Sequence, residues 1–332
     1  MSFIAIIIFN LIIFFNIDFI IKKYEVYDYP DKVRKIHKKK ISLSGGLIIF
    51  LNFFFIFFCY SFDGSQFENL IKYFFNNSNI NLFLFLFYLT VVFLFGFFDD
   101  KFNIRANIKF IFLLIFIFFS INLDSSLVIY KINFSFSKSI FYLKQFEIFF
   151  TILCFLLFIN AFNMFDGINL QSAFYSLFLL FIFLVIGFAV EIIIILILSL
   201  LFFSYLNYNN KCFLGDNGSL LIAFILSFLF IKSYNSNYIT NADQIFLLMM
   251  IPGVDLLRLA ITRIYNGKHP FRGDRDHFHH NILEKYGYNK TILITFFIIV
   301  IPNIVSLILG GTLYLILLSG IIYSVLLFSI KK

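Results

Sequence analysis

Long apolar runs separated by short polar loops occur along almost the whole chain. A bilayer core about 30 Å thick requires roughly 20 apolar residues per helix, so runs of this length predict transmembrane helices. The pattern predicts about eleven of them, or ten if one of the tight joins at 187–191 or 310–311 does not separate two helices. The predicted ranges are 3–21, 44–62, 81–98, 106–122, 146–162, 170–187, 190–207, 219–233, 244–262, 291–309 and 312–330. The predicted fold class is an all-α integral membrane protein.

The composition agrees with this interpretation. Of the 332 residues, 61% are hydrophobic and 13% are charged, whereas soluble globular proteins have roughly 45–50% and 25%. No linker-like or repeated segment divides the chain, so we predict one polytopic membrane domain over residues 1–332. The first apolar run lacks the basic segment and the cleavage site of a signal peptide, which predicts a retained helix with Asp18 as an interfacial or helix-contact acid.

The basic residues predict how the chain is oriented, because cytosolic loops of membrane proteins are enriched in lysine and arginine. With the N-terminus outside, 21 of the 26 basic residues lie on the inner side. The other five are Lys72, Lys131, Lys138, Lys144 and Lys232. The predicted topology is therefore N-out and C-in. The net charge of +8 is accounted for by this asymmetry, and since no soluble basic domain exists we expect no nucleic-acid partner.

Two shorter features complete the pattern. Cys59, Cys154 and Cys212 are far apart, lie within or beside apolar runs and form no C-x-x-C spacing. We interpret them as small packed hydrophobic residues, with neither a disulfide nor a zinc site. On the outer side, residues 124–145 alternate in part between apolar and polar positions, which predicts a β-hairpin.

The most unusual polar segments lie at the inner ends of the predicted helices. They are residues 29–46, the pair Asp99–Asp100, and residues 160–170, 213–220 and 269–280. A transporter tends to hold ionisable groups near mid-membrane, at broken helices. The observed placement instead favours an enzyme whose active site is formed by cytoplasmic loops. A lipid-linked-sugar flippase or ion-coupled transporter and a non-catalytic scaffold are the alternatives.

Four aspartates in these loops indicate a divalent cation. Asp99 and Asp100 are adjacent anions at the end of an apolar helix, where they repel each other and are poorly solvated. A solvated helix end is the simpler explanation for that pair alone. Asp166 and Asp216 in two other inner loops favour a cation site, because Mg²⁺ is bound by a few carboxylates together with substrate phosphate oxygens.

Other residues of the inner loops are suited to a nucleotide substrate. Asn160 and Asn163 are three residues apart and so lie on one side of a helix, where their amides could bind a base or a ribose. An interfacial asparagine is unremarkable in this Asn-rich chain, so the spacing is a weak signal. In "GDNGS", glycines on both sides of Asp216 would let backbone N–H groups approach an oxyanion, and Ser219 could cap the next helix.

The last inner loop gathers cationic and histidine side chains suited to phosphate. They are Arg272, Arg275, His277, His279 and His280. Arginine binds phosphate in a bidentate way, and histidine can donate to a pyrophosphate. A zinc site is the competing interpretation, but no cysteine joins the cluster. In the first inner loop, Arg34 and His37 are candidates for substrate binding among lysines that serve as a membrane anchor.

An anionic substrate, a divalent cation and a position at the membrane edge together suggest phosphoryl transfer between a soluble nucleotide and a lipid phosphate. The ordered segments "RKIHKKKISLSGG", "GFFDDKFNIRANIK", "NAFNMFDG", "FLGDNGSL" and "FRGDRDHFHH" resemble the bacterial polyprenyl-phosphate N-acetylhexosamine-1-phosphate transferases. These enzymes are related to the transferase that starts peptidoglycan lipid synthesis. The resemblance extends over residues 28–290.

The resemblance implies a multi-pass enzyme of the bacterial inner membrane that transfers a sugar-1-phosphate from a UDP-sugar to undecaprenyl phosphate and releases UMP. It also implies Mg²⁺, with Mn²⁺ as a substitute. Asp99, Asp100 and Asp166 match catalytic acids of the family, and Asp216 matches the metal-ligating acid, with Asp99 or Asp100 as further ligands. The histidine motif matches His277, His279 and His280. The product would initiate a lipid-linked glycan of the cell envelope, such as lipopolysaccharide. A homodimer is left open.

The chain departs from the family pattern at two places. An acid is usual soon after the "DD" pair and a second Asp-Gly is usual after "DG", but here those positions are Asn103 and Asn169–Leu170. The family's roles for those acids are therefore not transferred. The segment "DRDHFHH" resembles the amino-sugar branch, which favours UDP-N-acetylhexosamine, and GlcNAc-1-phosphate in particular. The phospho-MurNAc-pentapeptide transferase of peptidoglycan synthesis is the alternative.

Overall fold

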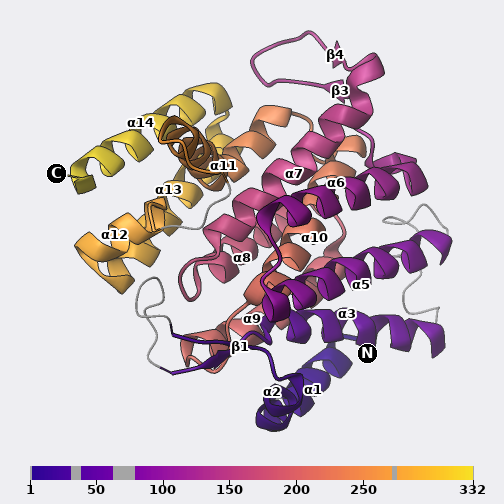
Figure 1. Ribbon diagram of the computed structural model, residues 1–332. Helices are drawn as coiled ribbons and strands as arrows, with labels where there is room; N and C mark the ends of the chain where they lie inside the picture. The colour runs from indigo at the N-terminus through magenta and orange to yellow at the C-terminus, as the bar shows by residue number, and fades with distance from the viewer. Residues whose placement is uncertain (1, 31–38, 63–78, 271–274, 332) are drawn as a thin grey trace. The chain divides into compact units, whose positions relative to one another are not determined.

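The structure is a computed structural model that describes residues 2–30, 39–62, 79–270 and 275–331. Within these ranges the chain is almost entirely helical (Figure 1). Most of the helices are apolar on every side, which is typical of helices in a membrane or in the centre of a helical bundle. The helices form two compact units, one of Met1–Ile104 with Ser176–Ile225 and one of Arg105–Tyr175 with Leu226–Lys332.

Unit 1 contains the N-terminal helices and strands. They are α1 (Ser2–Phe15), α2 (Ile17–Tyr24), β1 (Tyr27–Asp28), β2 (Ile41–Ser42), α3 (Gly45–Phe62), α5 (Asn79–Phe102), α9 (Val190–Tyr208) and parts of α8 (Gln171–Val185) and α10 (Gly215–Asn235). Helix α3 packs against α1, α5 and α9. Phenylalanine rings stack across two of these contacts, with Phe9–Phe55 centroids 4.2 Å apart and Phe50–Phe93 centroids 4.5 Å apart.

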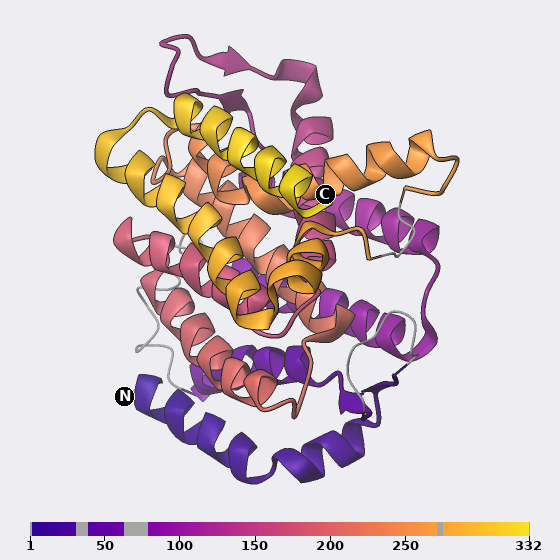
Figure 2. The ribbon, with the colours of Figure 1, turned by 90° about the vertical axis from the view of Figure 1, so that its left-hand side faces the viewer.

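Unit 2 contains the remaining elements. They are α6 (Ala106–Leu123), β3 (Lys131–Ile132), β4 (Phe141–Tyr142), α7 (Glu147–Phe165), α11 (Ala242–Tyr265), α12 (Phe278–Tyr286), α13 (Tyr288–Leu309), α14 (Thr312–Lys331), the short 3₁₀ turns η2 (Ser125–Leu127) and η3 (Lys144–Phe146), and the rest of α8 and α10. Helix α11 packs against α7, α13 and α14, and the short α12 packs against α13 and α14. Figure 2 shows α13 and α14 lying side by side as two neighbouring helices.

Every range predicted as a transmembrane helix coincides with a helix of the structure, or with the pair α1–α2 for residues 3–21. By length and composition, eight helices of the described residues could cross a membrane, and nine if the bent pair α1–α2 is one span. Two others, Gly45–Phe58 and Gln171–Val185, are apolar but shorter. The prediction of an all-α membrane protein is confirmed. The number of spans and the N-out, C-in orientation stay predictions, as does the single domain.

Helices α1 and α2 meet at a bend of 68°. Asn16 lies at the break, and its side-chain Nδ2 donates to the carbonyl of Ile12 at 2.8 Å instead of capping α2. Asp18 is exposed in the first turn of α2, where the helix dipole favours a negative charge. The single acid in this apolar segment therefore lies at a helix terminus and not within a packed core.

Two small antiparallel strand pairs join the helices. The predicted hairpin is confirmed: β3 pairs with β4 through Lys131–Tyr142 and Ile132–Phe141, and it extends beyond the end of α7 in both ribbon views (Figures 1 and 2). The pair β1–β2, through Tyr27–Ser42 and Asp28–Ile41, was not predicted, because each strand is only two residues long. Cys154 is half-buried and Cys212 is buried, both as free thiols.

Candidate active site

In unit 1, Asp100 binds the first turn of α10. Its Oδ1 accepts the backbone N–H of Asp216 at 2.8 Å, and its Oδ2 accepts the backbone N–H of Asn217 at 3.0 Å and also the Asn217 side-chain amide. The first N–H groups of a helix have no partner within the helix, and a carboxylate beside them is favoured by the helix dipole. Asp100 therefore acts as the N-terminal cap of a helix that begins 115 residues later in the chain.

This contact explains why α10 begins at Gly215, four residues before the predicted start at Ser219. The backbone N–H groups of Asp216 and Asn217 in the "GDNGS" segment bind the Asp100 carboxylate, so the approach of a substrate oxyanion to this segment stays a prediction. Gly215 has φ +73°, and a Cβ there would lie 2.7 Å from Asp100 Oδ2. Ser219 is buried inside the helix, so the predicted capping role of Ser219 is wrong.

Three more glycines, Gly46, Gly96 and Gly218, allow the backbones of α3 and α5 to approach the first turn of α10 closely. A Cβ on Gly96 of α5 would overlap the backbone of Asn217 and lie 2.7 Å from the Asp216 carbonyl. A Cβ on Gly218 would lie 2.9 Å from the Cα of Gly46 in α3. Small residues let membrane helices approach this closely. The Asn217 amide also donates to the carbonyl of Leu43 at 2.8 Å, so Asn217, which the sequence analysis did not select, joins α10, Asp100 and the segment before α3.

Asp99 has a different environment from Asp100. It is 1% exposed, and its Oδ1 accepts the backbone N–H of Ile104 at 3.0 Å. The backbone N–H of Asn103 donates to the Asp99 carbonyl at 2.8 Å, and Asn103 has φ +50°. Asparagine tolerates this left-handed conformation, which commonly ends a helix. The Asn103 that replaces a family acid thus terminates α5 and positions the turn that Asp99 binds.

The donor atoms in unit 1 fit a hard cation such as Mg²⁺ in kind. Asp100 and Asp216 are both half-buried, and the backbone contact between them places the two residues together. No group of three or more His, Cys, Asp or Glu side chains with metal-binding geometry occurs among the described residues. One or two carboxylates suffice for Mg²⁺, which keeps water ligands and binds substrate phosphate. The assignment of Asp216, Asp99 and Asp100 as metal ligands stays a prediction.

In unit 2, the Asp166–Gly167 turn meets the histidine segment. Asp166 ends α7, and its Oδ1 accepts a hydrogen bond from the Ser172 hydroxyl at the start of α8. A Cβ on Gly167 would overlap the imidazole of His279 at Nε2. The Phe165 ring also meets the His279 ring edge-on, with centroids 6.1 Å apart. Two predicted site segments that are over a hundred residues apart in sequence are therefore side by side within this unit.

The three histidines form a cluster at the start of α12. The rings of His277 and His279 are stacked with centroids 5.3 Å apart, and those of His279 and His280 are 4.3 Å apart. His279 is 1% exposed, and its Nε2 has no hydrogen-bond partner among the described residues. Burial, together with the neighbouring His280 and His277, lowers the pKa of His279 well below its ordinary value of 6.5. His279 is therefore neutral at physiological pH.

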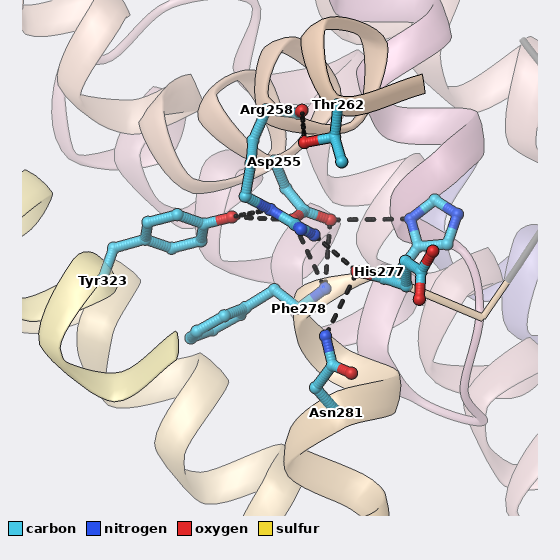
Figure 3. A network of polar contacts seen from close by, with 8 residues as sticks. Asp255, Arg258, Thr262, His277, Phe278, Asn281 and Tyr323 are labelled. Carbon is cyan, nitrogen blue, oxygen red and sulfur yellow. Dashed lines mark hydrogen bonds and ion pairs between the residues drawn. The ribbon is translucent and has the colours of Figure 1, made fainter. Parts of the chain in front are cut away.

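A polar network that the sequence analysis missed supports this cluster (Figure 3). Asp255 of α11 binds Arg258 one turn later and Tyr323 of α14, and it also faces the backbone N–H of Phe278 and the ring of His277. Asp255 and Arg258 lie within a predicted transmembrane helix, where ionisable groups are rare and often functional. That rarity was the available signal, but the surrounding apolar residues concealed it.

The remaining predicted site residues have simpler outcomes. Asn160 is half-buried and its side-chain Nδ2 donates to the carbonyl of Leu156 in its own helix at 2.7 Å. Asn163, Arg275 and His280 are also half-buried. The side chains of Arg34, His37 and Arg272 lie outside the described residues, so their predicted roles stay predictions. Each unit thus holds one part of the predicted site.

Residues 82–234 match glycosyl transferase family 4. The matched segment includes Asp99, Asp100, Asp166 and Asp216. The resemblance inferred from the motifs is confirmed. Curated relatives include undecaprenyl-phosphate alpha-N-acetylglucosaminyl 1-phosphate transferases of several bacteria. The enzyme of that name from Escherichia coli strain K12 is 26% identical over 292 residues, which is 84% of this chain and 75% of the relative.

A relative of the same name from Haemophilus influenzae is 34% identical over 90 residues. That alignment covers 26% of this chain and 25% of the relative's own length. The Salmonella typhi enzyme is 25% identical over 292 residues, again 84% of this chain. The similarity to these relatives is thus modest in identity but extends well beyond one motif.

Proposed function

We propose that this protein transfers N-acetylglucosamine-1-phosphate from UDP-N-acetylglucosamine to undecaprenyl phosphate and releases UMP. The observation that carries the proposal is the family match over residues 82–234, which encloses all four predicted aspartates in family order. The printed names of the relatives favour the GlcNAc-1-phosphate reaction over the MurNAc-pentapeptide alternative. The product would begin a lipid-linked glycan of the cell envelope.

In the proposed reaction, a phosphate oxygen of the lipid attacks the sugar-linked phosphorus of the UDP-sugar. The bond from that phosphorus to the bridging oxygen breaks, and the bridging oxygen leaves on UMP. Because the attacking lipid phosphate is already anionic, no strong general base is required. Such transfers depend mainly on positioning and on stabilising the charge of the phosphoryl group.

The protein's residues would share this work. Asp216, together with Asp100 or Asp99, would hold Mg²⁺. When bound, the ion would neutralise pyrophosphate charge. Asp100 would also fix the backbone that carries Asp216, since it caps the same helix. Arg275 would contribute charge to the pyrophosphate, and neutral His279 a hydrogen bond. Asp166 would act beside the histidine cluster, at the Gly167 turn.

The proposed topology agrees with the same assignment. Ten or eleven spans with the N-terminus outside and the C-terminus inside would put the four aspartates and the histidine segment on the cytosolic face of the inner membrane, where UDP-sugars are available. The excess of basic residues in those loops supports this orientation. Undecaprenyl phosphate would then enter the site laterally from the bilayer.

A direct assay tests the function. Detergent-solubilised protein is incubated with labelled UDP-N-acetylglucosamine and undecaprenyl phosphate, with and without Mg²⁺, and UMP and lipid-linked sugar are measured. We expect both products in equal amounts, only when the lipid and the cation are present. Formation of UMP without a lipid-linked sugar would refute the proposal. The absence of any product with every member of a panel of UDP-sugars would refute it as well. A flippase would release no UMP under any of these conditions.

Substitutions test the metal-binding assignment. We expect Asp216→Asn and Asp99→Asn to insert normally but to lose about 10²- to 10³-fold in rate, as is usual when one electrostatic partner of a reacting group is removed. Asp18→Asn, an exposed acid in α2, is the charge-matched control and should retain activity. Near wild-type turnover in both test variants would remove the metal assignment.

A further inference from the structure

We propose that Asp255 is a positioning residue that fixes the ring of His277 for the phosphoryl transfer, and that Arg258 and Tyr323 hold Asp255 in place. This inference rests on the proposed function, because it gives His277 a contact with the pyrophosphate. It adds two residues of helix α11 and one of helix α14 to a site that the family motifs place in loops.

One carboxylate oxygen of Asp255 is held by side chains of two helices. Oδ1 accepts from Arg258 Nη2 at 2.7 Å and Nε at 3.1 Å, and from the Tyr323 hydroxyl at 2.7 Å. Arg258 Nε also donates to the Tyr323 oxygen at 2.9 Å. Asp255 itself is 6% exposed. A buried carboxylate is stable only when charged and hydrogen-bonding partners surround it, and these two residues supply them.

The other oxygen of Asp255 is directed at the histidine segment (Figure 3). Oδ2 lies 3.5 Å from His277 Nδ1 and accepts the backbone N–H of Phe278 at 3.2 Å. Phe278 is the first residue of α12, so Asp255 caps that helix as well. The carboxylate therefore contacts both the side chain of His277 and the backbone that immediately follows it.

The backbone before His277 is also tied to this network. Arg258 Nη2 donates to the carbonyl of Asp276 at 2.5 Å, and the Asn281 side chain donates to the same oxygen at 3.1 Å. The peptide units on both sides of His277 are thus fixed by Asp255 and Arg258. If Asp255 and Arg258 served only to join α11 to α14 through Tyr323, they would need no contacts with either of these peptide units.

The geometry favours one arrangement of the His277 ring. His277 Nδ1 makes no hydrogen bond to the described residues, but the carboxylate oxygen 3.5 Å away favours the ring proton on Nδ1, which leaves Nε2 as the nitrogen available to a ligand. The stacking of His277 on His279 extends this control, since a rotated His277 would displace the ring that adjoins Gly167. The expected cost of losing such a supporting contact is about 10- to 100-fold in activity.

A double-mutant cycle tests the positioning role. The rates of UMP release are compared for wild type, Asp255→Asn, His277→Ala and the double variant. If Asp255 acts through His277, Asp255→Asn lowers kcat about 10- to 100-fold in the wild type, with little further effect once His277 is absent. Equal fold losses in both backgrounds, or wild-type kcat in Asp255→Asn, would overturn the proposal. A merely structural role predicts additive losses.

Asp243 provides the matched control, because it is another buried aspartate of α11, twelve residues earlier and therefore about 18 Å away along the helix axis. It accepts the backbone N–H of Ser135 at 2.8 Å and has no contact with the histidines. Any loss in Asp243→Asn should be additive with His277→Ala. If Asp243→Asn and His277→Ala were as strongly non-additive as Asp255→Asn and His277→Ala, the effect would reflect a general loosening of α11. That result would contradict the proposal.

A milder variant keeps the test decisive if Asp255→Asn does not fold. Tyr323→Phe removes only the hydroxyl that binds Asp255 and keeps the ring that packs on Phe278. We expect a smaller fall in kcat that disappears in the His277→Ala background; a loss that persists there contradicts the proposal. An inactive wild type would instead refute the proposed function, so the two failures are distinguishable.

Discussion

At the scale of single residues, the two adjacent aspartates at the end of α5 have separate tasks. Asp100 binds the N–H groups of Asp216 and Asn217, whereas Asp99 binds the N–H of Ile104 in the turn that follows α5. The two carboxyl groups can be neighbours in an apolar region because each accepts hydrogen bonds from different backbone N–H groups. A pair that looks equivalent in sequence is therefore inequivalent in structure.

The first prediction separates the roles of Asp100 and Asp216. Asp100→Ala should destabilise the protein by about 1–2 kcal/mol, the usual cost of a lost helix cap, because a methyl group cannot accept the N–H groups that the carboxylate holds. Asp216→Asn leaves the Asp100 cap in place and should lower the melting temperature less. Thermal unfolding of both variants in detergent is the measurement, and equal melting temperatures would contradict the capping role.

The second prediction concerns acid stability and His279. Its pKa is lowered in the folded state, so below about pH 6.5 the unfolded chain binds a proton that the folded protein resists. Stability contributed by the neutral ring is complete above that pH and is lost as the pH falls toward the folded-state pKa, by at most about 1.4 kcal/mol per pH unit. Melting temperatures between about pH 7 and pH 5 should fall less steeply for His279→Asn than for wild type. Parallel curves would be the contrary result.

At the scale of elements, helix α10 shows what the apolar pattern does and does not predict. Its apolar core was predicted from residues 219–233, since continuous hydrophobic runs of this length specify membrane helices. Its true start at Gly215 depends on a cap from Asp100, a partner that no local pattern contains. Among the apolar helices it has the lowest mean hydropathy, 1.5, and its apolar window is completely buried.

Short polar elements were the other omission. Helix α12 has only nine residues and a mixed composition, so neither its length nor its periodicity separated it from the surrounding loop. The Asp255 network was hidden for the opposite reason, since "IPGVDLLRLA" has the composition of a membrane helix. The family motifs selected the Asp166 and histidine segments, which the structure brings side by side. Their contact through Gly167 required the three-dimensional structure.

The third prediction tests the close packing of α5 on the first turn of α10. Gly96→Ala places a methyl group against the backbone of Asn217, which cannot move as a side chain could. We expect a loss of about 1–3 kcal/mol, as for other overpacked sites, and reduced activity because Asp216 moves with that backbone. Gly253→Ala in α11, where a Cβ meets no atom within 4 Å, is the control and should be neutral or stabilising. Similar melting temperatures for both variants would exclude the predicted overlap.

At the scale of the whole molecule, the distribution of basic residues predicts the orientation of the chain in the membrane. Lysines and arginines are concentrated in alternate loops, whereas the exposed surfaces of helices such as α13 and α14 are rich in leucine, isoleucine and phenylalanine. Those surfaces are suited to lipid contact, because apolar side chains need no burial within the protein in a bilayer. The residues predicted or proposed to take part in the chemistry are few, and those that the structure describes lie at helix ends or in the network around Asp255.

The fourth prediction tests the topology. In a variant with its native cysteines replaced by alanine, Lys138→Cys between β3 and β4 should react with a membrane-impermeant maleimide in intact cells, because that loop is predicted to be outside. Lys101→Cys near the end of α5 should react only after the membrane is opened. Both lysine positions are exposed, so differences in labelling report membrane side and not burial. The reverse labelling pattern would invert the topology and place the four aspartates outside the cell.

The Tyr323 hydroxyl bond to Asp255 has a consequence for biosynthesis. Tyr323 follows every other member of the network in sequence, so α11 and α12 have already been synthesised before the ribosome adds the residue whose hydroxyl binds Asp255. A chain that ends at a nonsense codon before residue 323 would contain every family motif but would lack this hydrogen bond to Asp255. Under the proposed positioning role, full activity therefore requires translation through codon 323.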